Sequence, residues 1–208
     1  MAGLLAREFS GAVRVKLLSP PPLNTPMFIQ KLGAQLSLMH GDTIVAEAEQ
    51  GTMTSRSLSC PDPALILSQR EFFPTHQQHP LPSCFVCGPA RSSDDGLNIF
   101  PVPFDDHGVG SLWRPHKSVQ DDAGRIPTEI LWAALDCPGY FAHQKTNTLM
   151  LLGSMTACVF SKPQADQMFT VCGWQTQQVG RKYYSTTAIF DENRLLCGQS
   201  EQIWITLK

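Results

Sequence analysis

Apolar and polar residues alternate along most of this chain in short runs, the pattern that half-buried β-strands leave in a sequence. Between residues 12 and 50 the runs are AVRVKLL, MFIQKL, AQLSLMH and TIVAEAEQ. A second series begins at residue 109, with VGSLWRP, LLGSMTACVFS, QMFTVCGWQTQ, RKYYSTTAIF and LLCGQSEQIWITL. Turn-forming stretches such as HGD, KPQAD, QVG and DEN separate several of these runs. We therefore predict two groups of strands, the second an antiparallel meander.

One long stretch breaks the alternation. The segment TEILWAALDCPGYFAH, residues 128–143, is mostly apolar and long enough to form a helix. Pro138 removes a backbone donor from this segment, so we expect the helix to kink or restart there. The N-terminal stretch MAGLLAREFSG has a shorter helical pattern. A long helix on one face of an antiparallel sheet is an α+β arrangement.

Residues 53–106 differ in composition from both strand groups. They hold many of the prolines together with several Ser and Asp residues, two His and a Cys pair. Ordered connections of this length are usually functional or packed across a neighbouring element. We predict a short helix in PALILSQREF and a division of the chain into residues 1–52, a connecting segment 53–106, and residues 107–208.

The two strand groups also resemble each other. PPLNTPMF (21–28) and KPQADQMF (162–169) share Pro, Met and Phe at matching offsets, and each lies between predicted strands. This similarity predicts an internal duplication. The first copy lacks an opening strand and most of its helix. Either an abbreviated repeat or a chain truncated before Met1 would explain the difference.

Composition narrows the class of protein. Charged residues make up 16% of the 208 residues, hydrophobic residues make up 42%, and the formal net charge is −2. Such a chain can bury a large core, and it lacks the basic excess that nucleic-acid binding needs. No apolar stretch reaches the roughly 18 residues that span a bilayer. Seven scattered cysteines favour free thiols in a reducing compartment, so we expect a cytoplasmic protein.

Two segments carry a resemblance to a known family. ALDCPGYFA (134–142) is similar to the central helix of phenylacetyl-CoA-type and other acyl-CoA thioesterases, and CFVCGPARSSDDGLNIFP (84–101) is similar to a segment before the first strand in some thioesterase-like proteins. The resemblance implies a hotdog fold, an antiparallel sheet wrapped around a central helix, here in two repeats. It also implies an acyl-CoA or carrier-bound thioester as the substrate, thioester hydrolysis without a cofactor, and a homodimer.

The predicted catalytic group is the carboxyl of Asp136, which should have a raised pKa on an apolar helix face. It would act as general base or nucleophile. The related thioesterases open this helix with a glycine-rich segment whose backbone N–H polarises the thioester carbonyl. Here the segment reads GRIPTE, and Pro127 offers no N–H. We expect Thr128 to cap the helix and the N–H groups after it to be the oxyanion donors, so Thr128 and the adjacent Glu129 are predicted to belong to the catalytic site with Asp136.

Four further residues are predicted to contact the substrate. Trp132 and Tyr140 lie one turn on either side of Asp136, and His143 shares its helical stripe. Arg181, in a predicted turn, would contact a CoA phosphate.

Simpler interpretations remain open for these residues. Asp136 would cap a second helical piece that starts at Pro138, and Glu129 and His143 would be residues favoured by the helix dipole. Arg181 would be an ordinary exposed charge. The corresponding alternative function is a hotdog protein that binds acyl groups, or has a structural role, without hydrolysing them.

The segment HQQHPLPSCFVC raises the question of a metal. His76, His79, Cys84 and Cys87 are the ligand types of a structural zinc site. Only four residues separate the two pairs, however, where such sites usually leave roughly a dozen or more. We therefore expect a packed loop with free thiols and no metal ion.

Overall fold

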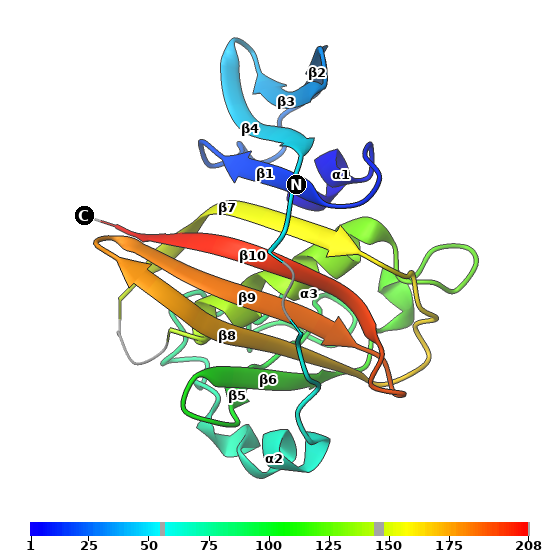
Figure 1. The fold of residues 1–208 in the computed structure, drawn as a ribbon, viewed down its shortest axis with the longest axis vertical. Helices are drawn as coiled ribbons and strands as arrows, with labels where there is room; N and C mark the ends of the chain where they lie inside the picture. The colour runs from blue at the N-terminus through cyan, green and yellow to red at the C-terminus, as the bar shows by residue number, and fades with distance from the viewer. Residues whose placement is uncertain (55–56, 144–147, 208) are drawn as a thin grey trace.

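The sheet is the main element of the fold (Figure 1). The computed structural model describes residues 1–54, 57–143 and 148–207, and within these ranges ten antiparallel strands form a single sheet in the order β2-β3-β4-β1-β7-β10-β9-β8-β6-β5. The strands are β1 (Val13–Leu17), β2 (Phe28–Leu32), β3 (Gln35–His40), β4 (Thr43–Gln50), β5 (Val102–Pro103), β6 (Gly108–Trp113), β7 (Met150–Val159), β8 (Phe169–Val179), β9 (Lys182–Phe190) and β10 (Leu196–Thr206). The predicted strand groups are confirmed.

The helices are few and mostly short. They are α1 (Ala2–Ala6), α2 (Pro63–Ser68) and α3 (Thr128–Phe141), with 3-10 turns η1 (Arg70–Phe72) and η2 (Lys117–Val119). α3 is the long helix predicted from residues 128–143, and it lies along the sheet (Figure 1). The predicted α+β class is confirmed. Of the helices described, none is long and apolar enough to cross a membrane.

Strand order shows that the fold contains two repeats. The order β1-β4-β3-β2 on one side of the sheet repeats the order β7-β10-β9-β8 on the other. The repeats join where β1 pairs antiparallel with β7, with Val15 opposite Met155. The similar sequence segments end at equivalent places, because Phe28 begins β2 and Phe169 begins β8. Among the described residues the first repeat has no counterpart of β6. The exact domain boundaries stay a prediction.

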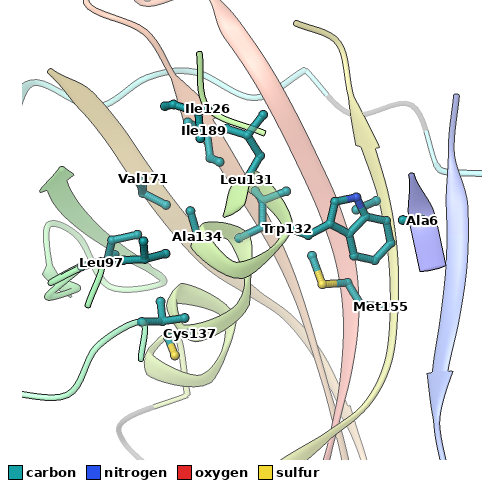
Figure 2. Packing of buried hydrophobic residues seen from close by; sticks show 14 of the residues in the cluster. Ala6, Leu97, Ile126, Leu131, Trp132, Ala134, Cys137, Met155, Val171 and Ile189 are labelled. Carbon is teal, nitrogen blue, oxygen red and sulfur yellow. The ribbon is translucent and has the colours of Figure 1, made fainter. Parts of the chain in front are cut away.

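Helix α3 is buried on several sides, which explains its nearly continuous apolar sequence. Leu131 and Leu135 are 1% and 0% exposed. Figure 2 shows Leu131 near Ile126 and Ile189, while Trp132 lies on another side of the helix with Met155 and Ala6. Burial of each such side chain is worth about 1.5–3 kcal/mol relative to exposure. These contacts fix α3 between the sheet and the first repeat.

Helix α1 is the first repeat's contribution to this packing. A Cβ added to Gly3 would lie 2.5 Å from the Cα of Glu129, so the backbones of α1 and α3 approach closely only because residue 3 is glycine. Together the two helices form the contact between the repeats on the helical face.

The prediction that the helix restarts at Pro138 is wrong. α3 continues through Pro138 to Phe141, and the N–H of Ala142 donates to the Pro138 carbonyl at 3.0 Å. Proline is tolerated there because close packing supports the helix. A Cβ on Gly173 of β8 would lie 2.5 Å from the carbonyl carbon of Pro138. The sheet therefore touches the helix backbone at this point.

Gly173→Ala should lower the free energy of unfolding by about 1–3 kcal/mol, because the added methyl group collides with backbone that cannot rotate away. Gly198→Ala in β10 is the control, since its added Cβ meets its nearest atom, the Cys158 carbonyl oxygen, at 3.3 Å. Denaturant unfolding followed by circular dichroism measures both changes. Equal effects of the two substitutions would contradict the close helix–sheet contact.

Candidate functional site

Asp136 lies past the middle of α3 with its carboxyl largely withdrawn from solvent. Oδ1 is buried and has no hydrogen-bond partner among the described residues, although the residue as a whole keeps partial exposure. A capping carboxylate would accept backbone N–H groups, and no such bond to Asp136 exists in this part of the chain. The interpretation of Asp136 as a cap is therefore wrong.

The environment of Asp136 favours its neutral form. Burial, with a smaller contribution from the neighbouring Cys84 thiolate, raises the pKa of this carboxyl from 3.8 to about 7, and the charge of the Met1 ammonium opposes the shift. The raised pKa agrees with the sequence expectation, and its principal cause is desolvation. Both protonation states are accessible near neutral pH.

The first turn of α3 lies apart from Asp136. The prediction that Thr128 caps the helix is wrong. The N-cap is Pro127, which makes no side-chain cap, and Thr128 is the first helical residue. Asp136 follows Thr128 by eight positions along the helix, which corresponds to roughly 12 Å along the axis. The N–H groups after Thr128 and the side chain of Glu129 are therefore not brought together with the acid.

The two aromatic residues predicted beside Asp136 belong largely to the core. Trp132 is 3% exposed, and with Thr128 it lines a surface cavity of about 340 Å³ near the end of β7. Tyr140 packs edge-on against Trp204, with ring centroids 5.6 Å apart. Packing of these rings is thus the contact that the structure shows.

His143 and Arg181 lie near the far end of α3. His143 is 1% exposed beside Tyr183, and burial lowers its pKa to about 4, opposed by a hydrogen bond with the backbone of Tyr184. A neutral imidazole gives no charge to the helix dipole, so this lowered pKa argues against the dipole interpretation of His143 near neutral pH. Arg181 is exposed and donates to the Thr206 carbonyl at 2.6 Å.

A buried polar cluster on the sheet holds α3 beside Asp136. Gln202 Nε2 and Thr187 Oγ1 donate to the carbonyl of Leu135 at 2.6 and 2.8 Å. Trp204 Nε1 donates to Gln202 Oε1 at 2.8 Å, and the Thr187 and Ser200 hydroxyls lie 2.6 Å apart. Sequence reasoning missed this cluster. Its signal is the period-two series Ser200, Gln202, Trp204, which places polar residues on the buried side of β10.

Three cysteines form the only potential metal-binding set of His, Cys, Asp or Glu found within the described ranges. Their sulfur atoms, those of Cys84, Cys87 and Cys137, all lie within 4.8 Å of one another. His76 and His79 are not part of this set, and His76 is exposed. The four-ligand arrangement considered from the sequence is therefore not assembled.

The outer face of the sheet carries a separate cavity of about 490 Å³. Polar side chains line it, among them Arg14, Glu49, Thr156 and Glu201. Asp136 lines neither this cavity nor a larger one of about 730 Å³ beside Cys60, Phe104 and Trp174, so the cavities and the candidate acid point to different places. We give more weight to the acid, because a buried carboxyl without partners is the rarer feature.

Comparisons with known proteins give the fold. No protein-family model matches the chain, and no curated protein matches it. Among solved structures, the acyl-CoA thioesterase II TesB2 from Mycobacterium marinum aligns with a TM-score of 0.62 and 10% identity over 99% of this chain and 87% of its own. The tesB protein of Mycobacterium avium subs paratuberculosis gives 0.60 and 14% over 100% and 84%. A protein with a hot dog fold from Alicyclobacillus acidocaldarius gives 0.58 and 14% over 95% and 78%.

The chain therefore has the hotdog fold. Its two repeats and the full-length alignments make it a double hotdog within one chain. The predicted fold is confirmed. At identities of 10–14% the likeness establishes architecture, and the activity has to be argued from the site.

Gln202→Leu should lower the free energy of unfolding by about 1–3 kcal/mol, because the buried Trp204 N–H loses its acceptor and the Leu135 carbonyl loses a donor. Gln199→Leu, a half-buried position on the same strand, should change it by less than about 0.5 kcal/mol. Urea titration of both variants measures the difference. A Gln202 variant as stable as the Gln199 variant would contradict the role of the cluster.

Proposed function

We propose that this chain hydrolyses an acyl thioester, acyl-CoA or a carrier-bound acyl group, with Asp136 as the general base. The observation that carries the proposal is the Asp136 carboxyl, held on the central helix of a double hotdog with Oδ1 buried and unpartnered in the described structure. A carboxyl retained in this way without a structural partner is a candidate for catalysis. Two of the similar structures bear the names of acyl-CoA thioesterase or tesB proteins.

In the proposed reaction Asp136 first accepts a proton and later donates it. The Asp136 carboxylate takes a proton from water as the oxygen attacks the thioester carbonyl carbon. The tetrahedral intermediate then collapses with cleavage of the carbon–sulfur bond, and the proton passes from Asp136 to the departing thiolate. The products are a carboxylic acid and a free thiol. Thr128 and Glu129, two turns away, would contact the acyl group or carrier rather than the reacting carbonyl.

The hydrogen-bond donors expected for the oxyanion lie far from Asp136. Pro127 has no N–H, and the N–H groups that follow Thr128 lie about two turns of helix from Asp136. This observation favours the second candidate function, binding of an acyl-CoA or acyl group without hydrolysis. Both functions involve the same thioester partner and the same helix, and they differ in whether the bound thioester is hydrolysed. One experiment that measures both binding and turnover therefore separates them.

The remaining expectations concern the substrate contacts, the cellular compartment, the oligomeric state and the lack of a cofactor. Arg181 is exposed and able to meet a CoA phosphate. All seven cysteines are free, which favours a reducing compartment such as the cytoplasm. The homodimer, Trp132, Tyr140 and His143 as substrate contacts, and hydrolysis without a cofactor stay predictions.

The test is turnover of a panel of acyl-CoAs by the parent chain and by Asp136→Asn. We expect the substitution to lower kcat/KM by roughly 10²–10⁴-fold, because the amide cannot accept the proton. Free CoA is best followed by chromatography, since the protein's own cysteines react with thiol reagents. Asp166→Asn, at an exposed position, is the matched control and should keep full activity.

Three outcomes contradict parts of the proposal. Equal activity in the parent and Asp136→Asn removes Asp136 from the mechanism. Calorimetric binding of acyl-CoA by the parent without turnover selects the non-catalytic function. An absence of both binding and turnover across the panel contradicts both functions.

A further inference from the structure

A cysteine from the central helix completes a cluster with the CFVCG loop. Cys137 of α3 lies 53 residues along the chain from Cys84, and their sulfur atoms are 3.7 Å apart. Cys87 is the third member, with all three sulfur atoms within 4.8 Å of one another. Figure 2 shows Cys137 projecting from α3. Three sulfur atoms at such distances can bind one ion together, because zinc–sulfur bonds are about 2.3 Å long.

The loop that carries the first two cysteines is tightly built. Gly88 N–H donates to the Cys84 carbonyl at 2.9 Å, and a Cβ on Gly88 would lie 2.5 Å from the backbone nitrogen and oxygen of Cys84. The N–H groups of Leu97 and Ile99 donate to Phe85 and Val86 carbonyls at 2.8 and 2.9 Å. The loop therefore presents its sulfur atoms from a fixed backbone.

Backbone donors also point at the sulfur of Cys84. Hydrogen bonds from the Cys137 and Cys87 side chains, and then from the N–H groups of Cys87 and Val86, hold the pKa of the Cys84 thiol well below its usual value. The same shared hydrogen bond with Cys84, together with burial, raises the pKa of the Cys137 thiol. Hydrogen bonds from backbone N–H groups to sulfur stabilise the negative charge of the ionised cluster.

We propose that Cys84, Cys87 and Cys137 bind a divalent metal ion, Zn²⁺ in particular, as three thiolate ligands. Binding releases the protons that the thiols carry, and the ion compensates the negative charges of the three thiolates. Thiolates prefer soft or borderline cations, which favours Zn²⁺ over Mg²⁺ or Ca²⁺.

The fourth tetrahedral position falls to a water molecule. His79 is the alternative that the sequence offers, but its Nδ1 accepts the Leu81 N–H at 3.1 Å. In a neutral imidazole the proton is then on Nε2, which cannot coordinate a metal in that state. Cys84 is partly exposed, so solvent can reach the cluster from its side. The ion would join residues 84–88 to α3 directly beside Asp136. The inference does not rest on hydrolysis.

The first test is the metal content of the full-length chain, purified without chelators and exposed to Zn²⁺ and then desalted. We expect about one zinc ion per chain, a fall of at least tenfold in Cys84→Ser and Cys87→Ser, and no change in Cys158→Ser. Cys158 is the control because it is a free, half-buried cysteine outside the cluster. Equal zinc content in the cluster variants and the parent would overturn the site.

A second measurement avoids substitutions that could prevent folding, which concerns the buried Cys137 most. Cobalt(II) added to the unmodified chain should give the intense near-ultraviolet absorption of sulfur-to-cobalt charge transfer, and zinc should abolish it. Zinc should also raise the melting temperature of the parent but not of Cys84→Ser. Absence of the absorption with reduced thiols, or a Cys84–Cys137 disulfide in protein kept under reducing conditions, would overturn the proposal.

Discussion

The burial of α3 against the sheet is the constraint on which the rest of this structure depends. Leu135 is 0% exposed, and its carbonyl is held by Gln202 and Thr187 from the sheet. Small residues make the contact possible, since a Cβ at Gly139 would collide with the side chain of Gln202 and one at Gly173 with the backbone of Pro138. These contacts fix how α3 lies against the sheet. In that position, Asp136 and Cys137 are on other sides of the helix than these contacts.

This packing explains why a helix can carry both Pro138 and a buried acid. Close neighbours support the helix through the proline, so no break is needed to present Asp136. The polar cluster satisfies the carbonyl of Leu135 and makes no hydrogen bond to the neighbouring acid, Asp136, in the described structure. Its Oδ1 is left without a partner among the described residues, while Gln202, Thr187 and Ser200 are fully paired nearby. Two polar groups of the same helix segment therefore differ in role. The sheet holds the Leu135 carbonyl, whereas Asp136 Oδ1 has no hydrogen-bond partner in the described structure.

Much of the fold could be predicted from the sequence because its signals are local. Alternation gave the strands, the apolar run gave α3, and the shared Pro, Met and Phe positions gave two equivalent strand starts at Phe28 and Phe169. The behaviour at Pro138 could not be predicted, since it depends on Gly173, which is distant in sequence.

Less of the site could be predicted from the sequence, because it depends on contacts between residues that are distant along the chain. Asp136 was identified because an acid in an apolar helix is conspicuous, and its raised pKa follows from desolvation. Thr128 was misassigned as a cap because the cap residue depends on backbone conformation at Pro127. Spacing along the chain also argued against a metal at Cys84 and Cys87. It carried no information about Cys137, which reaches them from the central helix.

In the proposed mechanism a thioester carbonyl meets the attacking water beside Asp136 in the double hotdog. A crystal structure of the chain with a non-hydrolysable thioether analogue of acyl-CoA tests it directly. The account predicts a water molecule hydrogen-bonded to Asp136 and roughly 3–3.5 Å from the carbon that replaces the carbonyl carbon. An analogue seated in the cavity on the outer face of the sheet, with Asp136 remote from its reactive end, would contradict the account.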